Sequence, residues 1–213
     1  MLKLSEIFGS LQGESTYAGL PCIFIRLAGC NLRCSYCDTK YAYSVKFQMN
    51  NDQILQKLQK YTPVKLVEIT GGEPLAQVEV YHLMQKLHAR DYKILLETNG
   101  SLPLKQVPQF VHKIVDIKCP GSGEADSFKE INLRFLDKNT DEIKFVLASK
   151  EDYEFARRKI SEYNLAGYEI LFSTVFGKLQ PAKLAKWITE DKLPVRLQLQ
   201  LHKYIWSPDK KGV

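Results

Sequence analysis

The sequence predicts an α/β fold built on a parallel sheet and arranged as an α/β barrel. Short apolar runs alternate with amphipathic segments along the 213 residues, and the connections between them are short. This order implies right-handed crossovers between parallel strands. Polar and glycine-containing motifs directly follow several of the runs, and α/β barrels carry their chemistry at the carboxyl ends of their strands.

The predicted elements come in a regular order along the chain. The strands are expected at residues 22–27, 66–70, 94–97, 111–117, 143–148, 169–173 and 195–199, and the helices at 52–60, 78–90, 151–162 and 181–190. The first helix places Ile54, Leu55 and Leu58 on one face, with Asn51-Asp52 as its cap and Pro63 as its stop. Because no repeat or linker divides the chain, we expect one domain over residues 1–213.

Composition is consistent with a soluble metalloenzyme from a reducing compartment. Hydrophobic residues make up 45% of the chain, enough for a core without disulfides. The five cysteines are an odd number and three are clustered, which argues against a secreted disulfide framework. The first residues lack the apolar stretch of a signal peptide, and no run approaches the roughly 20 apolar residues of a membrane span. We therefore expect a cytoplasmic protein without a membrane segment.

The net charge of +6 says little about partners, because the 30 basic residues are spread along the chain. No basic stripe or nucleic-acid-binding module is present, so we expect no direct binding to nucleic acid.

A cysteine-rich loop is the strongest functional signal. Cys30, Cys34 and Cys37 are spaced C-x3-C-x2-C. A structural zinc site has four protein ligands, whereas three thiolates on a four-iron cluster leave one iron open for another ligand. A zinc site completed by a distant ligand remains an alternative. Cys22 reads as a core residue, and Cys119 as a buried or merely nearby thiol.

Three further motifs follow predicted strands. They are Gly71-Gly72-Glu73-Pro74, Glu97-Thr98-Asn99-Gly100 and Asp116-Ile117-Lys118. Two glycines let a ligand approach the backbone, and a glutamate can bind an amino group. Each motif alone is also consistent with an ordinary turn. Their order, together with the cysteine loop, indicates a single site at one end of the barrel.

The cysteine loop followed by Gly-Gly-Glu-Pro resembles the radical S-adenosylmethionine (SAM) superfamily over nearly the whole chain. The resemblance implies a partial (βα)6 barrel and a [4Fe-4S] cluster on Cys30, Cys34 and Cys37, whose open iron chelates SAM. It implies SAM contacts from Tyr36, Asp38, Gly72, Glu73, Thr98, Asn99, Lys118 and Ser173. The family pattern after the fourth strand is Ser-Pro-Lys-like, and this chain departs from it with Asp116-Ile117-Lys118-Cys119-Pro120.

The N-terminal run Phe8-Gly9-Ser10-Leu11-Gln12-Gly13-Glu14-Ser15 is similar to the 7-carboxy-7-deazaguanine synthase (QueE) family. Residues 23–30 resemble it too, and residues 198–206 resemble its last strand. The resemblance implies ring contraction of 6-carboxy-5,6,7,8-tetrahydropterin to 7-carboxy-7-deazaguanine with loss of ammonia, on the route to queuosine. It also implies Mg2+ bound by Thr39, a flavodoxin-like reductant and a homodimer.

Residue types agree with a pterin substrate. Gln12 supplies a donor and an acceptor, Glu14 accepts from amino and ring N–H groups, and Arg26 suits a carboxylate. Alternation places Arg26 on the face of Phe24, toward the barrel interior. The predicted substrate residues are Gln12, Gly13, Glu14, Arg26, Thr70, Gln200 and His202.

Simpler roles remain open for some of these residues. Arg26 suits a structural salt bridge, Thr39 an ordinary turn, and His202 a structural position in a final strand.

Two other functions are consistent with part of the sequence. A glycyl-radical-enzyme activase shares the cysteine loop and small size, but Gln12-Gly13-Glu14 with Arg26 favours a small polar substrate. A non-catalytic zinc or iron–sulfur binding module leaves the polar motifs at the strand ends unexplained.

Overall fold

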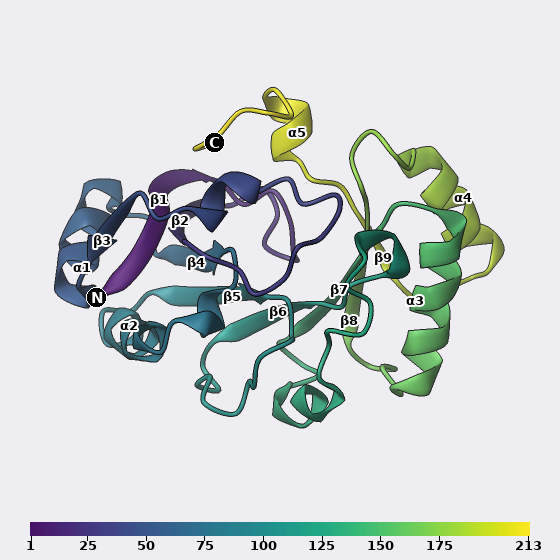
Figure 1. Cartoon of the computed structure of the whole chain (residues 1–213), viewed down its shortest axis with the longest axis horizontal. Coiled ribbons are helices and arrows are strands. Elements are labelled where there is room, and N and C mark those ends of the chain that lie inside the picture. The colour runs from purple at the N-terminus through teal and green to yellow at the C-terminus, as the bar shows by residue number, and fades with distance from the viewer.

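The computed structural model describes residues 1–213 and contains one nine-stranded sheet in the order β3-β1-β2-β4-β5-β6-β7-β8-β9 (Figure 1). The strands are β1 Leu2–Leu11, β2 Pro21–Leu27, β3 Phe47–Met49, β4 Leu66–Gly71, β5 Lys93–Thr98, β6 His112–Asp116, β7 Glu142–Leu147, β8 Glu169–Thr174 and β9 Arg196–Gln198. The helices are α1 Asn51–Leu58, α2 Glu79–His88, α3 Lys150–Glu162, α4 Pro181–Glu190 and α5 His202–Ile205.

The parallel part of the sheet confirms the predicted fold class. Neighbours from β2 through β4 to β9 pair in parallel, and they correspond to the seven predicted strands. Strands β1 and β3 were not predicted; β1 is antiparallel to both β2 and β3. A register shift between Leu4 and Glu6 interrupts the alternation of β1, which hid the strand in the sequence.

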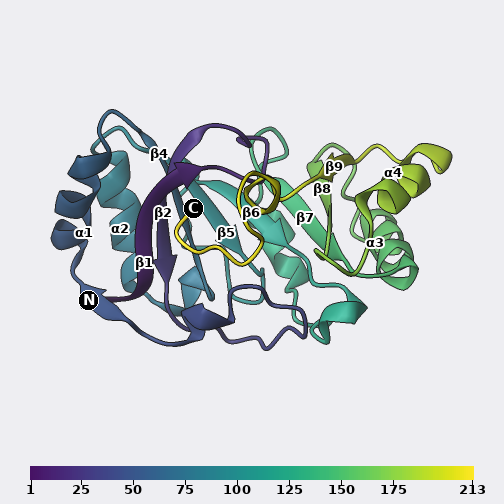
Figure 2. The ribbon, with the colours of Figure 1, turned by 90° about the horizontal axis from the view of Figure 1, so that it is seen from above.

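The barrel is open and reduced. Strands β3 and β9 are the free edges of the sheet. The crossover from β5 to β6 contains no helix, and the one from β6 to β7 contains only the 3-10 turns Pro120–Ser122 and Glu130–Phe135. Helices α1 and α2 flank one end of the sheet, and α3 and α4 flank the other (Figure 1). Seen from above, the strands follow one another across the molecule from β1 on the left to β9 on the right (Figure 2).

Alternation along the strands separates two apolar regions. The larger core holds 36 buried residues, contributed by both the sheet and helices α1 to α4. A smaller set, here called the inner apolar cluster, consists of Cys22, Phe24, Leu66, Leu95 and Ile114. Each of these five residues is two or four positions along its strand from a side chain of β2, β4, β5 or β6 that lines the cavity. Because side chains at even spacing point to the same face of a strand, the five lie on the inner face of the sheet.

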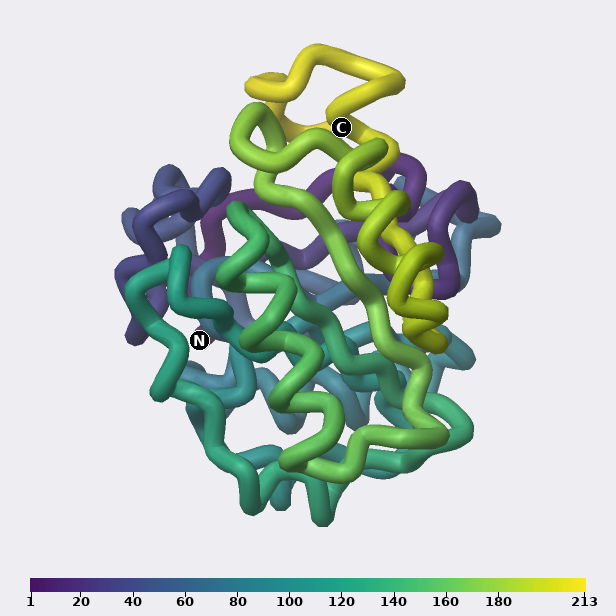
Figure 3. The backbone as a smooth tube through the Cα atoms, turned by 90° about the vertical axis from the view of Figure 1, so that its right-hand side faces the viewer, coloured from purple at the N-terminus to yellow at the C-terminus, as the bar shows by residue number.

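Two sequence expectations need correction. The N-cap of α1 is Asn50, whose side chain accepts from Gln53 N at 2.9 Å, rather than Asn51-Asp52. The last strand ends at Gln198, and His202 begins helix α5 instead of lying in a strand. The chain turns there because Leu201 N donates to Gly13 O at 3.0 Å, which fastens the segment to the N-terminal loop. Figures 1 and 3 show α5 and the C-terminal tail above the sheet.

None of the helices has both the length and the apolar character needed to span a bilayer.

Candidate active site

One cavity of about 720 Å³ collects nearly all the predicted site residues. Its walls come from the loops after β2, β4, β5, β6 and β8, from the 12–14 segment after β1, and from the C-terminal segment. The carboxyl ends of parallel strands meet at one edge of a sheet, and this explains why motifs far apart in sequence converge there. The predicted convergence of these motifs at the carboxyl ends of the strands is confirmed.

The cysteine loop forms one side of the cavity. Cys30, Cys34 and Cys37 are all partly buried and line the cavity. Gly72 packs so tightly under the loop that a Cβ there would lie 1.9 Å from Gly29 O and 2.9 Å from Cys30 Cβ. The Gly-Gly turn therefore supports the cysteine loop directly, and only glycine permits this approach.

The arrangement of the thiols suits a cluster better than a single ion. No three His, Cys, Asp or Glu side chains gather closely enough to share one metal ion. In a four-iron cluster each thiolate binds a different iron, so three thiols spaced around a cavity match it and a mononuclear zinc site does not. Burial raises the pKa of Cys30 and of Cys34, and the neighbouring Lys118 ammonium acts in the opposite direction. That ammonium suits thiolate ligands.

Cys22 and Cys119 lie outside the cavity. Both are buried, and neither lines it. The Cys119 thiol is directed to Ile117 O at 4.0 Å. The expectations that Cys22 lies in the core and that Cys119 is buried are confirmed.

Six of the predicted SAM residues line the cavity: Tyr36, Asp38, Gly72, Thr98, Asn99 and Lys118. The Asn99 side chain reaches the cysteine loop, donating to Asn31 Oδ1 at 3.2 Å. Asp38 Oδ2 pairs with Lys203 Nζ at 2.7 Å, and its Oδ1 accepts from the Thr39 hydroxyl at 2.8 Å. Thr39 also lines the cavity.

Two predicted SAM residues lie elsewhere. The Glu73 carboxylate is fully buried and accepts from Leu75 N, Thr98 Oγ1 and Asn99 N at 2.8–3.0 Å, so it does not face the cavity. Ser173 is fully buried, and its hydroxyl donates to Gln198 O at 3.2 Å. In this structure Glu73 fixes the loops after β4 and β5, and Ser173 ties β8 to β9.

All seven predicted substrate residues line the cavity or its wall. They are Gln12, Gly13, Glu14, Arg26, Thr70, Gln200 and His202. The C-terminal segment packs against the N-terminal loop. Gln200 Nε2 donates to Glu14 Oε1 at 2.8 Å, and a Cβ on Gly13 would lie 2.5 Å from His202 Nδ1. Burial lowers the pKa of His202, which favours a neutral imidazole.

Arg26 combines the two roles considered from the sequence. Its Nε donates to Glu6 Oε1 at 2.8 Å, which confirms a structural ion pair. The same side chain lines the cavity, and its Nη groups donate no hydrogen bond to the protein. The guanidinium therefore keeps donors for a ligand carboxylate while Glu6 fixes its orientation.

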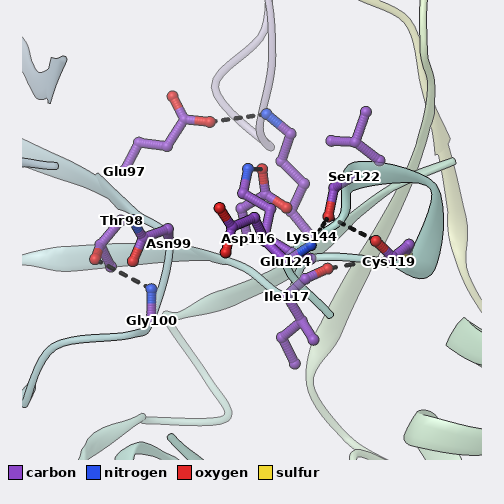
Figure 4. A network of polar contacts seen from close by, with 12 residues as sticks. Glu97, Thr98, Asn99, Gly100, Asp116, Ile117, Cys119, Ser122, Glu124 and Lys144 are labelled. Atoms are coloured by element: carbon purple, nitrogen blue, oxygen red, sulfur yellow. Dashed lines mark hydrogen bonds and ion pairs between the residues drawn. The ribbon is translucent and has the colours of Figure 1, made fainter. Parts of the chain in front are cut away.

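A charged network inside the barrel was not predicted. Lys144 on β7 forms an ion pair with Glu14. It forms another with Glu97 at 2.8 Å (Figure 4). On the cluster side, Lys118 pairs with Asp116 at 2.6 Å. Burial opposes the charge on Lys144, but Glu14 and Glu97 hold its pKa well above the usual range. A charged residue at an inward position of an apolar strand was the signal available in the sequence.

The fold and the cysteine-lined cavity define a radical SAM protein. The family model of the radical SAM superfamily matches residues 24–120. The 7-carboxy-7-deazaguanine synthase of Koribacter versatilis is 48% identical, with all of both chains covered. That of Chlorobaculum tepidum is 46% identical, covering all of this chain and 97% of the relative. The chain belongs to the 7-carboxy-7-deazaguanine synthase family.

A solved structure supports the fold independently. The crystal structure of QueE from Escherichia coli superimposes with a TM-score of 0.75 over 94% of each chain, at 23% identity. At that identity the likeness concerns the fold alone.

Proposed function

We propose that this protein is a 7-carboxy-7-deazaguanine synthase that converts 6-carboxy-5,6,7,8-tetrahydropterin to 7-carboxy-7-deazaguanine and ammonia. One observation carries the proposal. The Gln12-Gly13-Glu14 segment and Arg26, which match the family's substrate residues, lie in the same cavity as the three cysteines. Cavities of about 300–1,000 Å³ hold drug-sized ligands, so 720 Å³ gives room for SAM beside a small bicyclic substrate.

The residues divide into two groups by their place in the cavity. Cys30, Cys34 and Cys37 would hold the [4Fe-4S] cluster, and Gly72 and Asn99 lie next to that loop as candidate SAM contacts. When bound, the cluster and SAM supply a 5′-deoxyadenosyl radical that abstracts hydrogen from the substrate. Lys118 adds positive charge on this side, which suits the carboxylate of SAM.

The residues of the second group, Arg26, Glu14 and Thr39, suit the substrate and its Mg2+. The free guanidinium donors of Arg26 would bind the substrate carboxylate, and Glu14 would accept from ring N–H or amino groups. Thr39 offers one oxygen for Mg2+, an ion that keeps several waters and accepts further ligands from substrate. Helix α5 and the tail also line the cavity and would limit water inside it.

The remaining proposals concern the reductant, the oligomeric state and the location of the protein. We propose a flavodoxin-like reductant, a homodimer and a cytoplasmic location, with no direct binding to nucleic acid. Free cysteines that act as cluster ligands suit a reducing compartment.

The proposal is tested by anaerobic reconstitution with iron and sulfide, followed by reductant, SAM, Mg2+ and 6-carboxytetrahydropterin. Mass spectrometry should find both 5′-deoxyadenosine and 7-carboxy-7-deazaguanine. Deoxyadenosine without the deazaguanine would point to another substrate, such as the partner protein of an activase. Absence of both from protein with a full cluster would contradict the proposal.

A matched pair of cysteine variants tests the cluster ligands. Cys34→Ala should lose cluster iron and SAM cleavage, because its thiol lines the cavity. Cys119→Ala should retain both, because that buried thiol faces Ile117 O. SAM cleavage that survives Cys34→Ala would exclude Cys34 as a ligand.

A further inference from the structure

Glu68 is the one buried carboxyl group of the cavity that has no cationic partner. It projects from β4 on the same face as Thr70, lines the cavity, and is only 5% exposed. The other buried or half-buried carboxylates of the cavity are each paired with lysine: Glu14 and Glu97 with Lys144, Asp38 with Lys203, and Asp116 with Lys118. Glu68 therefore differs from all of them in its electrostatic setting.

Its surroundings disfavour a charge. The strand neighbours of Glu68 are Phe24 on β2 and Leu95 on β5, both members of the inner apolar cluster. Arg26, the nearest cation on β2, is paired with Glu6. Burial, followed by the negative charge of Glu97, raises the pKa of Glu68 to about 8. The group is therefore largely a neutral carboxylic acid at pH 7.

A hydrogen bond from Gln12 distinguishes the two oxygens of this acid. Gln12 Oε1 accepts from Glu14 N at 3.1 Å, which orients the amide so that its Nε2 donates to Glu68 Oε2. An oxygen that accepts in this way is the carbonyl oxygen, so the proton belongs on Oε1. Oε1 makes no hydrogen bond within the protein, yet it is not one of the unpaired polar atoms that are completely shielded from solvent. It remains in contact with the open space of the cavity.

We propose that Glu68 acts as an uncharged hydrogen-bond donor to an acceptor on the pyrimidinone ring of the substrate. This inference rests on the proposed function. The pyrimidinone ring carries a carbonyl oxygen and a ring nitrogen that accept hydrogen bonds, beside N–H groups that donate them. A carboxylate such as Glu14 serves the donors, and only a neutral acid serves an acceptor. The stacked pair Phe8 and Phe24, with ring centroids 4.9 Å apart, supplies a flat apolar wall beside Glu68.

The product keeps the same pyrimidinone ring, so product affinity reports this contact without turnover. We would measure binding of 7-carboxy-7-deazaguanine by anaerobic calorimetry to the reconstituted enzyme with SAM and Mg2+. Glu68→Gln stays neutral, still accepts from Gln12 and still donates, so affinity at pH 7 should stay within about threefold. Glu68→Leu suits the inner apolar cluster but strands the ligand acceptor and Gln12 Nε2. Its affinity should fall about 5- to 100-fold.

The pH dependence separates a neutral donor from a charged one. Wild-type affinity should fall as the pH rises through about 8, where Glu68 ionises, relative to Glu68→Gln over the same range. The other groups facing Glu68 do not confuse this comparison. Burial raises the pKa of Cys22, and anionic neighbours raise those of Arg26 and Lys144 against burial. Lys144 outweighs burial and lowers the pKa of Glu97, and Glu14 is paired with Lys144.

The control is Glu142→Gln, a buried carboxylate on the same inner face that bonds His112 and Thr16 outside this cavity. It should bind product as the wild type does. A tenfold or larger loss in Glu68→Gln at pH 7 would overturn the neutral donor, because it would show that a charge is required. Wild-type affinity in Glu68→Leu would overturn the contact itself. If Glu68→Leu fails to fold, the pH comparison with Glu68→Gln decides. A wild-type enzyme that neither binds nor forms the deazaguanine would instead overturn the proposed function.

Discussion

Gly72→Ala tests whether the Gly-Gly turn holds the cysteine loop in place. The added Cβ would lie 1.9 Å from Gly29 O, whereas real Cβ atoms do not approach closer than 3.0 Å. The loop must therefore move away by roughly 1 Å, and two hydrogen bonds stretch with it: Gly72 N to Leu27 O at 3.1 Å and Glu73 N to Gly29 O at 2.9 Å.

The expected cost follows from these contacts. Forcing an extra carbon into a packed site costs about 1–3 kcal/mol, and each weakened hydrogen bond adds about 1 kcal/mol. We expect a loss of about 3–5 kcal/mol in the free energy of unfolding of the apoprotein, measured by urea denaturation with an unchanged m-value. Cluster iron per chain should also fall, because the displaced backbone carries Cys30.

Gly19→Ala is the matched control. Its Cβ would meet nothing within 4 Å, and only its positive φ of 92° makes it unfavourable, at a cost of about 1–2 kcal/mol. Its iron content should equal that of the wild type. If Gly72→Ala has the iron content and stability of Gly19→Ala, the Gly-Gly turn does not support the loop and this reasoning fails.

Three further substitutions test two buried charges and the proposed magnesium ligand. Lys144→Met leaves Glu14 and Glu97 without their cation and should cost about 3–5 kcal/mol of unfolding free energy at pH 7. Lys144 lowers the pKa of Glu97, and without Lys144 burial raises that pKa, so the loss of unfolding free energy should shrink as the pH falls. A loss that does not depend on pH would contradict the pairing. Arg26→Ala should weaken substrate binding and leave SAM cleavage uncoupled from product formation. A change in stability alone would show that Arg26 serves only in the salt bridge with Glu6. Thr39→Val should raise the Mg2+ concentration needed for half-maximal product formation, and an unchanged Mg2+ titration would exclude its hydroxyl as a ligand.

Local sequence patterns were sufficient for most of the fold. The seven parallel strands are apolar runs with clear ends, and the four longer helices have one apolar face each, so short-range preference and burial agree. Strand β1 escaped prediction because its irregular register mixes Leu2 and Leu4 with Ser5 and Glu6. The C-terminal segment was misassigned because a contact with Gly13, far away in sequence, turns it out of the sheet.

The site was predicted best where residues are adjacent in sequence. The cysteine loop and the Gly-Gly turn could be recognised from spacing alone. The pairing of Lys144 with Glu97 and the lack of a cation beside Glu68 could not, because they depend on which strands become neighbours and on which carboxylates share a cation. For the same reason the sequence could not show that Glu73 faces protein donors rather than the cavity.

The fastening of the N-terminal loop to the C-terminal segment also governs when the site can form during synthesis. Gln200 bonds Glu14 across 186 residues, and Gln198 Nε2 donates to Ser15 O across 183. A ribosome adds about 5–20 residues per second, so roughly 10–40 s separate the emergence of these partners. During that interval the strands already synthesised have a polar interior that is open to water. The cavity is completed only when the last segment of the chain arrives.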